Sequence, residues 1–264
     1  MAVSMTSMRT FDNSIVKLEC HDRVESCQAI AREYASEGYA DKYAVISNYD
    51  YKLGGDEKGV YMSLLLRPSF FPSQAGLLSA LSVSALANAL AEHTEMRIGI
   101  GWVSSIYCEG KHIGGVSIEG KIGEMNGYEY IIINFAVKLS DENFPPRLTD
   151  LVKKIFENDN HSVTEIIAKN ILNKFFPLYA NMRNSTKFMQ TYKQRFVLTG
   201  HRVKRIKNGK KKSMRVLGVR TEDCALLLES KAESYDAVTS PQEVIIPKSV
   251  RLPNPPKQTG MIFN

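Results

Sequence analysis

Two stretches on either side of a long apolar segment decide the fold: GVYMSLLLRP at 59–68 and GWVSSIYCEGKHIGGVSIEG at 101–120. The first is an aliphatic strand that Pro68 ends, since proline cannot donate to a sheet. Residues 73–92 place apolar side chains at helical spacing in a wide stripe, which predicts a long helix packed on a sheet. Glu109-Gly110-Lys111 is a hairpin signal within the second stretch. The strands expected here are 60–67, 96–102, 105–108 and 112–119.

The sequence on both sides continues this alternation of strands and helices. Helical spacing over 24–36 has Asp22 as its expected N-cap and Gly38 just past its end. Ser162-Val163-Thr164-Glu165 is a capping box that begins a helix running to about residue 176. The other expected elements are strands at 15–18, 43–47 and 128–137 and helices at 148–157 and 185–195.

After Phe196 the pattern changes to the short strands VLTGHRV, SMRVLGV, CALLLES and EVIIP, separated by turns. Such strands are typical of a small antiparallel barrel. The sequence therefore predicts an α+β protein, with a mixed β-sheet backed by helices over 1–195, a barrel over 196–251 and a tail over 252–264.

Composition narrows the class of protein. The 264 residues are 44% hydrophobic and 23% charged, as in an ordinary soluble globular protein. No apolar stretch reaches the roughly 18 residues of a membrane helix, and the first residues have no signal-peptide core, so we expect a cytoplasmic protein without membrane contact. The four cysteines show neither CxxC nor Cys/His metal spacing, so we expect reduced thiols and no metal site.

The order and spacing of these segments resemble the catalytic domain of the biotin protein ligase family, within the biotin/lipoate ligase superfamily. That family has a mixed sheet backed by helices and a small SH3-like C-terminal barrel. LTGHRVKRI, VLGVRTEDCALLLES and SPQEVIIP match its opening, middle and closing barrel strands. The resemblance runs from near Ile15 to near Val250, and we expect the form of the family without an N-terminal DNA-binding domain.

The resemblance implies a two-step reaction. In the family, the biotin carboxylate attacks the α-phosphate of ATP, and a lysine of a biotin carboxyl-carrier protein then attacks the biotinyl-adenylate. Biotin, ATP and Mg²⁺ are therefore the implied cofactors and the carrier protein the implied partner, and some members form homodimers. Because a carboxylate approaches a polyphosphate, the site must supply positive charge and N–H donors.

The loop on the phosphate side of the family site matches residues 48–59. The family has several arginines there, but this stretch has none, and Lys52 and Lys58 stand against three acidic residues. Such a loop should repel a triphosphate. It is either an exposed connection or a nucleotide-binding loop in which Lys52 and Lys58 replace the arginines.

The family's tryptophan-proline-asparagine-aspartate motif is also altered. Trp102 matches the tryptophan, and Val103-Ser104-Ser105 replaces the rest. Two hydroxyls do not supply the carboxylate that helps to hold Mg²⁺. The resemblance makes Trp102, Ser104 and Ser105 ligand-binding positions, although a core position is the simpler interpretation of Trp102.

His112 stands where the family has the lysine that bridges the biotin carboxylate and the α-phosphate, and Lys111 precedes it. Histidine is shorter and mostly neutral at pH 7. Lys111 would take this role only after a one-residue shift of the hairpin, which turns its side chain to the other face. Lys111 and His112 are thus the catalytic candidates, and Gly114 and Gly115 are ligand-binding candidates by resemblance.

Two further matches are incomplete. The strand at 134–138, NFAVK, carries bulk where the family has glycines beside the ligand. Ser26-Cys27-Gln28 keeps only the serine of a serine-threonine-asparagine motif, so Ser26 is a further ligand-binding candidate.

A basic run occupies residues 201–215, where eight of fifteen residues are lysine or arginine. Asn208-Gly209 is a hairpin-turn signal, so this charge should lie on one exposed hairpin of the barrel. The run is either a solvated hairpin or, over Lys204–Arg215, a contact for an acidic protein or a nucleic acid. It lacks the interleaved aromatic residues of single-strand binders.

Three hypotheses follow. The leading one is a divergent biotin protein ligase-like protein that has lost or weakened adenylation and acts as a ligand-binding or regulatory module, with a pocket between hairpin 105–119 and helix 24–36. The second is an active biotin or lipoate ligase in which Lys111, Lys52 or Lys58 takes an altered role. The third is a protein- or nucleic-acid-binding module that uses the basic hairpin.

Overall fold

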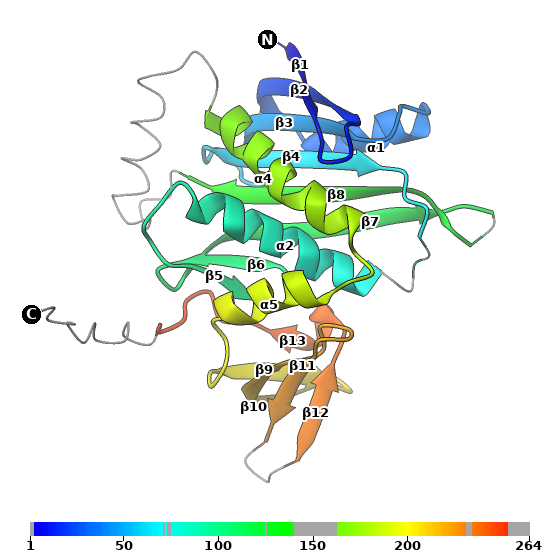
Figure 1. The fold of residues 1–264 in the computed structure, drawn as a ribbon. Helices are drawn as coiled ribbons and strands as arrows, with labels where there is room; N and C mark the ends of the chain where they lie inside the picture. The colour runs from blue at the N-terminus through cyan, green and yellow to red at the C-terminus, as the bar shows by residue number, and fades with distance from the viewer. Residues whose placement is uncertain are drawn as a thin grey trace, which may run out of the picture.

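The larger part of the protein is built on one mixed eight-stranded sheet (Figure 1). The structure, a computed structural model, describes residues 3–70, 72, 75–124, 126–139, 163–230 and 234–252. Only the β2–β3 pair is parallel among the strand pairs of this sheet. In spatial order the strands are β1 (Ser4–Arg9), β2 (Ile15–Val24), β3 (Tyr43–Asp50), β4 (Gly59–Leu66), β8 (Tyr128–Lys138), β7 (Lys111–Ile122), β6 (Ser105–Cys108) and β5 (Ile98–Gly101).

Helices cover the two faces of this sheet unequally. On one face α2 (Ala75–Ala91) packs against α4 (Val163–Ala180) and α5 (Thr186–Arg195), as Figure 1 shows in front of the sheet. On the other face α1 (Cys27–Ser36) packs mainly against β3, β4 and β8, and two of its side chains reach Glu119 in the second half of β7. Helix α1 makes no comparable contact with β6 or with the start of β7 among the described residues.

Alternation along β8 sends neighbouring residues to opposite faces, as in any strand. Ile131, Ile133 and Phe135 belong to the core shared with α2 and α4, and the Phe135 ring lies 6.3 Å from that of Phe175 in an edge arrangement. Ile132 belongs to the smaller core beneath α1, and Ala136 packs against it. Even-numbered residues of β8 thus face the side of the sheet on which α1 lies.

The C-terminal part is a five-stranded antiparallel sheet that curls into half a barrel. The indole Nε1 of Trp102 donates to the carbonyl of Cys224 at 2.7 Å, and the Tyr107 hydroxyl donates to the carbonyl of Pro247 at 2.6 Å. These bonds join the C-terminal part to the turn between β5 and β6 and to β6 itself. In spatial order the strands are β12 (Tyr235–Val238), β11 (Leu226–Glu229), β10 (Lys210–Val219), β9 (Arg202–Lys207) and β13 (Val244–Ile245).

The predicted fold class is confirmed, with differences at the edges of elements. Strands β1 and β12 were not predicted, and β2 and β3 run on past 18 and 47 because their parallel pairing continues to Val24 and Asp50. Helix α1 begins at Cys27 with Ser26 as its N-cap, in place of the predicted start near Val24 with Asp22 as cap. The predicted helix at 148–157 lies outside the described residues.

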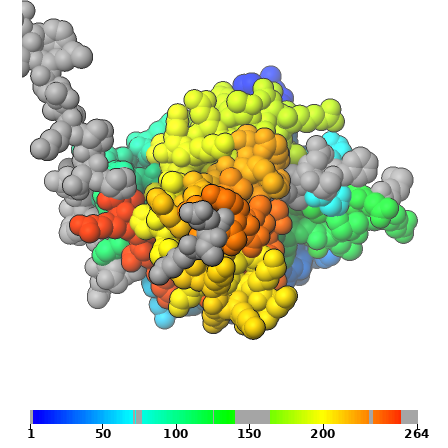
Figure 2. Space-filling model, turned by 90° about the horizontal axis from the view of Figure 1, so that it is seen from below, coloured from blue at the N-terminus to red at the C-terminus, as the bar shows by residue number. Residues whose placement is uncertain are grey.

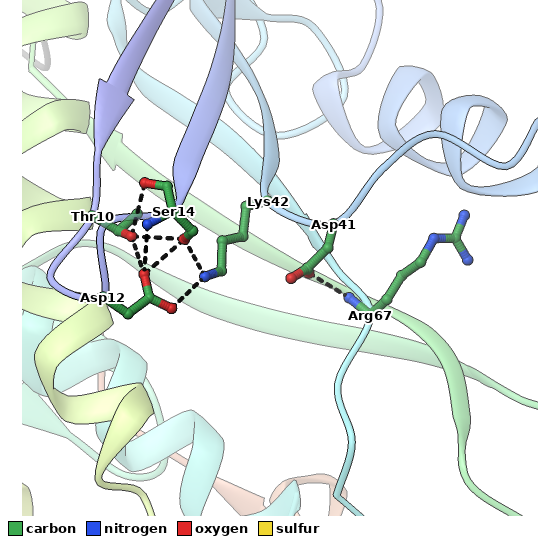
Figure 3. A network of polar contacts seen from close by, with 6 residues as sticks. All are labelled: Thr10, Asp12, Ser14, Asp41, Lys42 and Arg67. Carbon is green, nitrogen blue, oxygen red and sulfur yellow. Dashed lines mark hydrogen bonds and ion pairs between the residues drawn. The ribbon is translucent and has the colours of Figure 1, made fainter.

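The turn between β1 and β2 is held by side chains (Figure 3). The Asp12 carboxylate accepts from Lys42 Nζ at 2.7 Å and from the hydroxyl of Ser14 at 2.7 Å, and Thr10 also bonds to it. These bonds, that of Lys42 first, hold the pKa of Asp12 well below its usual range. A polar network therefore anchors an edge strand whose sequence has no apolar pattern.

Helix α4 continues through Pro177 to Ala180, beyond its predicted end. Tyr179 stacks on Phe175 at a ring-centroid distance of 5.2 Å, so aromatic packing stabilises the last turn. Within the part of the chain that the structure describes, we find no helix with the length and hydropathy of a membrane span.

Candidate functional site

A pocket of 340 Å³ opens on the sheet face that α1 leaves uncovered, and we call it the β7–β8 pocket. Its size is at the lower end of the range for small-molecule sites. It brings together five of the residues proposed from the sequence: Ser104, Ser105, His112, Gly114 and Gly115. The other lining residues are Leu53, Tyr61, Ile113, Val116, Ser117, Asn134, Ala136 and Lys138.

One wall of the pocket comes from β8. Asn134, Ala136 and Lys138 alternate along the strand and therefore share its pocket face. Asn134 Oδ1 accepts from the buried hydroxyl of Ser63 at 2.7 Å, and its Nδ2 donates to the Ser117 hydroxyl at 3.4 Å. These bonds fix the amide and leave a polar patch within a mostly apolar lining.

This register corrects the interpretation of 134–138 as a strand too bulky for a ligand. Phe135 and Val137 lie in the core on the opposite face, so their bulk does not enter the pocket. Only the small Ala136 stands between the two polar residues of the wall. Period-two alternation along 128–137 indicates which residues of this strand share a face. It could have identified Asn134 and Lys138, which were not among the predicted site residues.

The hairpin β6–β7 lies beside β8 in the same sheet and continues the lining of the pocket, and two glycines allow close approach of the strands. A Cβ on Gly114 would lie 2.0 Å from the carbonyl oxygen of Ala136, and one on Gly115 would lie 2.4 Å from that of Ser104. Gly114 also has φ of +154°, which L-residues rarely adopt. The glycines therefore serve the packing of strands around the pocket, whatever further contact they make.

A bulge in β7 decides which basic residue reaches the pocket. Ile106 pairs with Gly114 and Tyr107 pairs with His112, so Ile113 is an extra residue. The His112 ring packs edge-on against Tyr107 at 5.5 Å and lines the pocket. Lys111 pairs with Cys108 and with Ser249 and is not among the lining residues.

The surroundings of His112 favour its neutral form. Although the residue as a whole is exposed, burial of its ring, followed by the charges of Lys138 and Lys248, lowers its pKa below the usual 6.5. Its backbone N–H donates to the carbonyl of Lys248 at 2.9 Å. These surroundings therefore favour the neutral imidazole at pH 7.

The loop between β3 and β4 closes over the pocket without presenting its lysines. The buried Asp50 carboxylate accepts from the backbone N–H groups of Cys27, Lys52 and Leu53 at 2.7, 3.1 and 3.0 Å. Leu53 lines the pocket, but neither Lys52 nor Lys58 does. From the sequence, Asp50 was expected to repel phosphate. In the structure its carboxylate instead anchors the loop to α1.

Lys138, the one lysine among the described lining residues, is close to an acid. Lys138 Nζ lies 2.8 Å from a carboxylate oxygen of Glu57. Glu57 is in turn placed by the Tyr61 hydroxyl, which donates to its carbonyl at 3.0 Å. The positive charge at this end of the pocket is therefore largely balanced.

Two proposed ligand-binding residues lie elsewhere. Ser26 is buried, and its hydroxyl accepts from the Ala29 N–H at 3.2 Å as the N-cap of α1. Trp102 is 1% exposed and joins the barrel to the sheet. Helix α1, expected as a pocket wall, is instead tied to β7, because Gln28 and Arg32 both bond to Glu119 at 2.7 Å.

The residues of the pocket do not suit a magnesium-bound triphosphate. Among the described residues, no group of three or more histidine, cysteine or acidic side chains is placed to hold a metal ion. The described lining residues include no arginine, burial lowers the pKa of their histidine, and their lysine is paired with Glu57. A polyphosphate needs several cations or N–H donors at once, which this lining does not offer.

A second cavity, of 510 Å³, lies on the other side of the sheet between the β1–β2 turn and the end of α4. Asp12, Lys42, Phe70 and Tyr179 are part of its lining. It contains none of the residues proposed from the sequence.

Comparison with solved structures gives several matches over most of the chain. The biotin protein ligase from Aquifex aeolicus in complex with biotin and ATP has a TM-score of 0.63 at 19% identity, covering 86% of this chain and 97% of that one. A biotin protein ligase-like protein of unknown function from Silicibacter sp. TM1040 has a TM-score of 0.63 at 13% identity, covering 89% and 97%. The biotin acetyl coenzyme A carboxylase synthetase from Helicobacter pylori has a TM-score of 0.53 at 14% identity, covering 83% and 98%.

A scan of protein-family models gives no match, and neither does a search of curated proteins. At these identities the structural likeness establishes the fold. The chain therefore has the fold of the biotin protein ligases, as the sequence resemblance predicts.

Proposed function

We propose that this chain is a divergent biotin protein ligase-like protein that binds a small carboxylic acid in the β7–β8 pocket and has lost, or greatly weakened, ATP-dependent adenylation. It acts as a ligand-binding or regulatory module. In this proposal biotin or a similar acid is the ligand, and transfer to a biotin carboxyl-carrier protein is lost or greatly slowed.

The lining supports a small amphipathic acid. Ile113, Val116 and Ala136 supply apolar contacts, while Asn134 and Ser117 supply hydrogen-bonding groups already held in place. Lys138, although paired with Glu57, and the mostly neutral His112 both offer N–H donors, which suit a single carboxylate. A single carboxylate is less demanding than a triphosphate, because one charge-assisted bond already contributes about 1.5–3 kcal/mol.

The observation that carries the loss of adenylation is the neutral His112 at the position of the family's bridging lysine. A permanent cation there offsets the repulsion between the attacking carboxylate and the α-phosphate. Burial lowers the pKa of His112 below its usual value, so the histidine is mostly neutral at pH 7 and does not replace a permanent cation. The balanced Lys138–Glu57 pair supports the same conclusion.

One observation favours a second candidate, an active ligase with rearranged basic residues. Lys138 lines the pocket from the strand next to His112, so it is the residue able to take over the bridging role if Glu57 releases it. The pocket lining does not include the lysines that the sequence suggests for this role, which are Lys111, Lys52 and Lys58.

Calorimetric titration with biotin, lipoate, ATP–Mg²⁺ and a non-hydrolysable biotinyl-adenylate analogue tests the proposal, together with release of pyrophosphate from ATP and biotin. We expect binding of a carboxylic acid without pyrophosphate release. Pyrophosphate release that Lys138→Met abolishes would establish the active ligase instead. Binding of neither acid nor adenylate analogue would refute both.

A further inference from the structure

The hairpin of β9 and β10 concentrates positive charge in a short segment of the chain. We call residues Arg202–Arg215 the basic hairpin; they include eight lysines and arginines and no acidic residue. Its turn, Asn208-Gly209, has φ of 50° and 72°, the tight two-residue turn that the sequence predicts. All of the cations except Arg205 are exposed.

The register places like charges directly opposite one another. Three of the six cross-strand pairs are cation–cation pairs: Lys207 with Lys210, Arg205 with Lys212, and Arg202 with Arg215. Like charges at such positions destabilise a sheet. The arrangement therefore costs stability unless another charge balances it.

Among the residues that the structure describes, carboxylates balance only one of these cations. Arg205 lies 2.9 Å from Asp236 and 3.3 Å from Glu243. Among the described residues, the other seven cations have no carboxylate oxygen within 4.0 Å. Their charge is thus available to a partner.

These cations lie on a surface that other described elements leave open. Figure 2 views the molecule from the barrel end, and the yellow and golden residues of β9 and β10 lie on the outside of this face. Arg202, Lys204 and Lys211 share one side of the ribbon with Arg215, because residues paired across the strands point the same way. Lys207 and Lys210 lie beside the turn.

The composition of the basic hairpin selects the class of partner. Lysine is depleted in protein–protein interfaces, whereas five of these seven cations are lysines. The hairpin has no aromatic side chain on which unpaired bases would stack. A two-stranded ribbon with cations about 6.8 Å apart along each strand suits the backbone of a duplex, whose groove admits such a ribbon.

We propose that the basic hairpin binds the phosphate backbone of double-stranded nucleic acid without reading its sequence. This activity is separate from ligand binding in the β7–β8 pocket. Contacts of this kind position a protein on a duplex and carry no sequence information.

Fluorescence anisotropy with a labelled DNA duplex of about 20 base pairs at ~50 mM salt tests the proposal. We expect saturable binding that Lys207→Glu combined with Lys210→Glu weakens roughly tenfold or more. The matched control is Lys17→Glu combined with Lys187→Glu, two exposed lysines on β2 and α5 whose reversal lowers the net charge equally. The control should leave binding unchanged.

Three results would overturn the proposal: no binding of the unaltered protein, equal weakening in both double variants, or tighter binding of the single strand or of poly-glutamate than of the duplex. The single variant Lys210→Glu separates loss of binding from misfolding. It replaces a repulsive pair with Lys207 by an attractive one, so we expect a higher melting temperature together with weaker duplex binding. A fall in both would also contradict the proposal.

Discussion

In the β7–β8 pocket, His112 is held neutral and Lys138 lies 2.8 Å from Glu57, whereas seven exposed cations of the basic hairpin have no carboxylate partner among the described residues. Both regions are basic when their residues are counted along the chain. In three dimensions only the hairpin presents net charge. A count of lysines therefore does not give the charge of a site, because strand register and neighbouring acids decide which cations remain available.

The largest expected difference between the two regions is in their response to salt. Raising salt from about 50 to about 200 mM should weaken duplex binding roughly a hundredfold if the hairpin neutralises about four phosphates. Carboxylate binding in the pocket should weaken less than about threefold, since it involves one partly enclosed charge. Anisotropy measures the duplex affinity and calorimetry the carboxylate affinity over the same salt series. An equal salt dependence of the two affinities would contradict the difference in net charge between the two regions.

Restoring a permanent cation to the pocket should have the next largest effect. His112→Lys should tighten binding of a carboxylic acid by about 10–100-fold, as expected of one charge-assisted hydrogen bond. Lys111→Gln is the matched control, and we expect no change, because Lys111 does not line the pocket. A larger effect of the Lys111 variant, measured by calorimetry, would show that the bulge at Ile113 does not hold in solution.

The pH dependence of the pocket tests the neutral state of His112. Its pKa lies below 6.5, so it becomes charged only as the pH falls through that lowered value, while a carboxylic ligand with a pKa of about 4.3 stays ionised. We expect affinity for the acid to rise severalfold between about pH 7.5 and about pH 5.5, and to stay flat in His112→Gln. Calorimetric titration of both proteins across this pH range measures the two affinities, and an equal rise in His112→Gln would contradict the role of His112.

The free energy of unfolding should change in the opposite sense over that range. The unfolded chain, in which His112 has its ordinary pKa, takes up the proton first as the pH falls below about 6.5. Stability is therefore lost from about pH 6.5 down to the folded pKa, and His93, whose pKa burial also lowers, adds to this loss. Urea denaturation should show a smaller loss in His112→Gln than in the unaltered protein.

The smallest expected effect concerns the basic hairpin. Lys210→Glu should raise the free energy of unfolding by about 0.2–1 kcal/mol, since it replaces a like-charge cross-strand pair. Lys187→Glu, an exposed change on α5, should stay within about 0.5 kcal/mol of the unaltered protein. Denaturant midpoints measure both. A destabilising effect of Lys210→Glu would mean that the cations are balanced by groups other than those described.

Much of the fold could be predicted from local patterns. The apolar stripe over 73–92, the hairpin turn at Glu109-Gly110 and the turn at Asn208-Gly209 each specify a local structure and are found as predicted. Strands β1 and β12 have no apolar alternation and exist because neighbouring strands pair with them. No pattern within those strands could have revealed them.

The site was less predictable, because long-range geometry decides it. His112 and the glycines were found through their place in a hairpin, but the choice between Lys111 and His112 depends on one bulged residue, Ile113. Lys138 and Glu57 are distant in sequence and meet only through the pairing of Gly59 with Lys138. The pairing of these two charges could not be read from either segment alone.

Two hydrogen bonds, of Trp102 with Cys224 and of His112 with Lys248, tie the β5–β6–β7 region to the C-terminal part of the chain. The Cys224 carbonyl that receives the Trp102 indole and the Lys248 carbonyl that receives the His112 N–H both come from the C-terminal part of the chain. A gene fusion that exchanged this part for another would remove the hydrogen-bond acceptors of the Trp102 indole and of the His112 N–H. Grafting the sheet onto a different C-terminal part would therefore have to replace both acceptors to keep the β6–β7 hairpin in place.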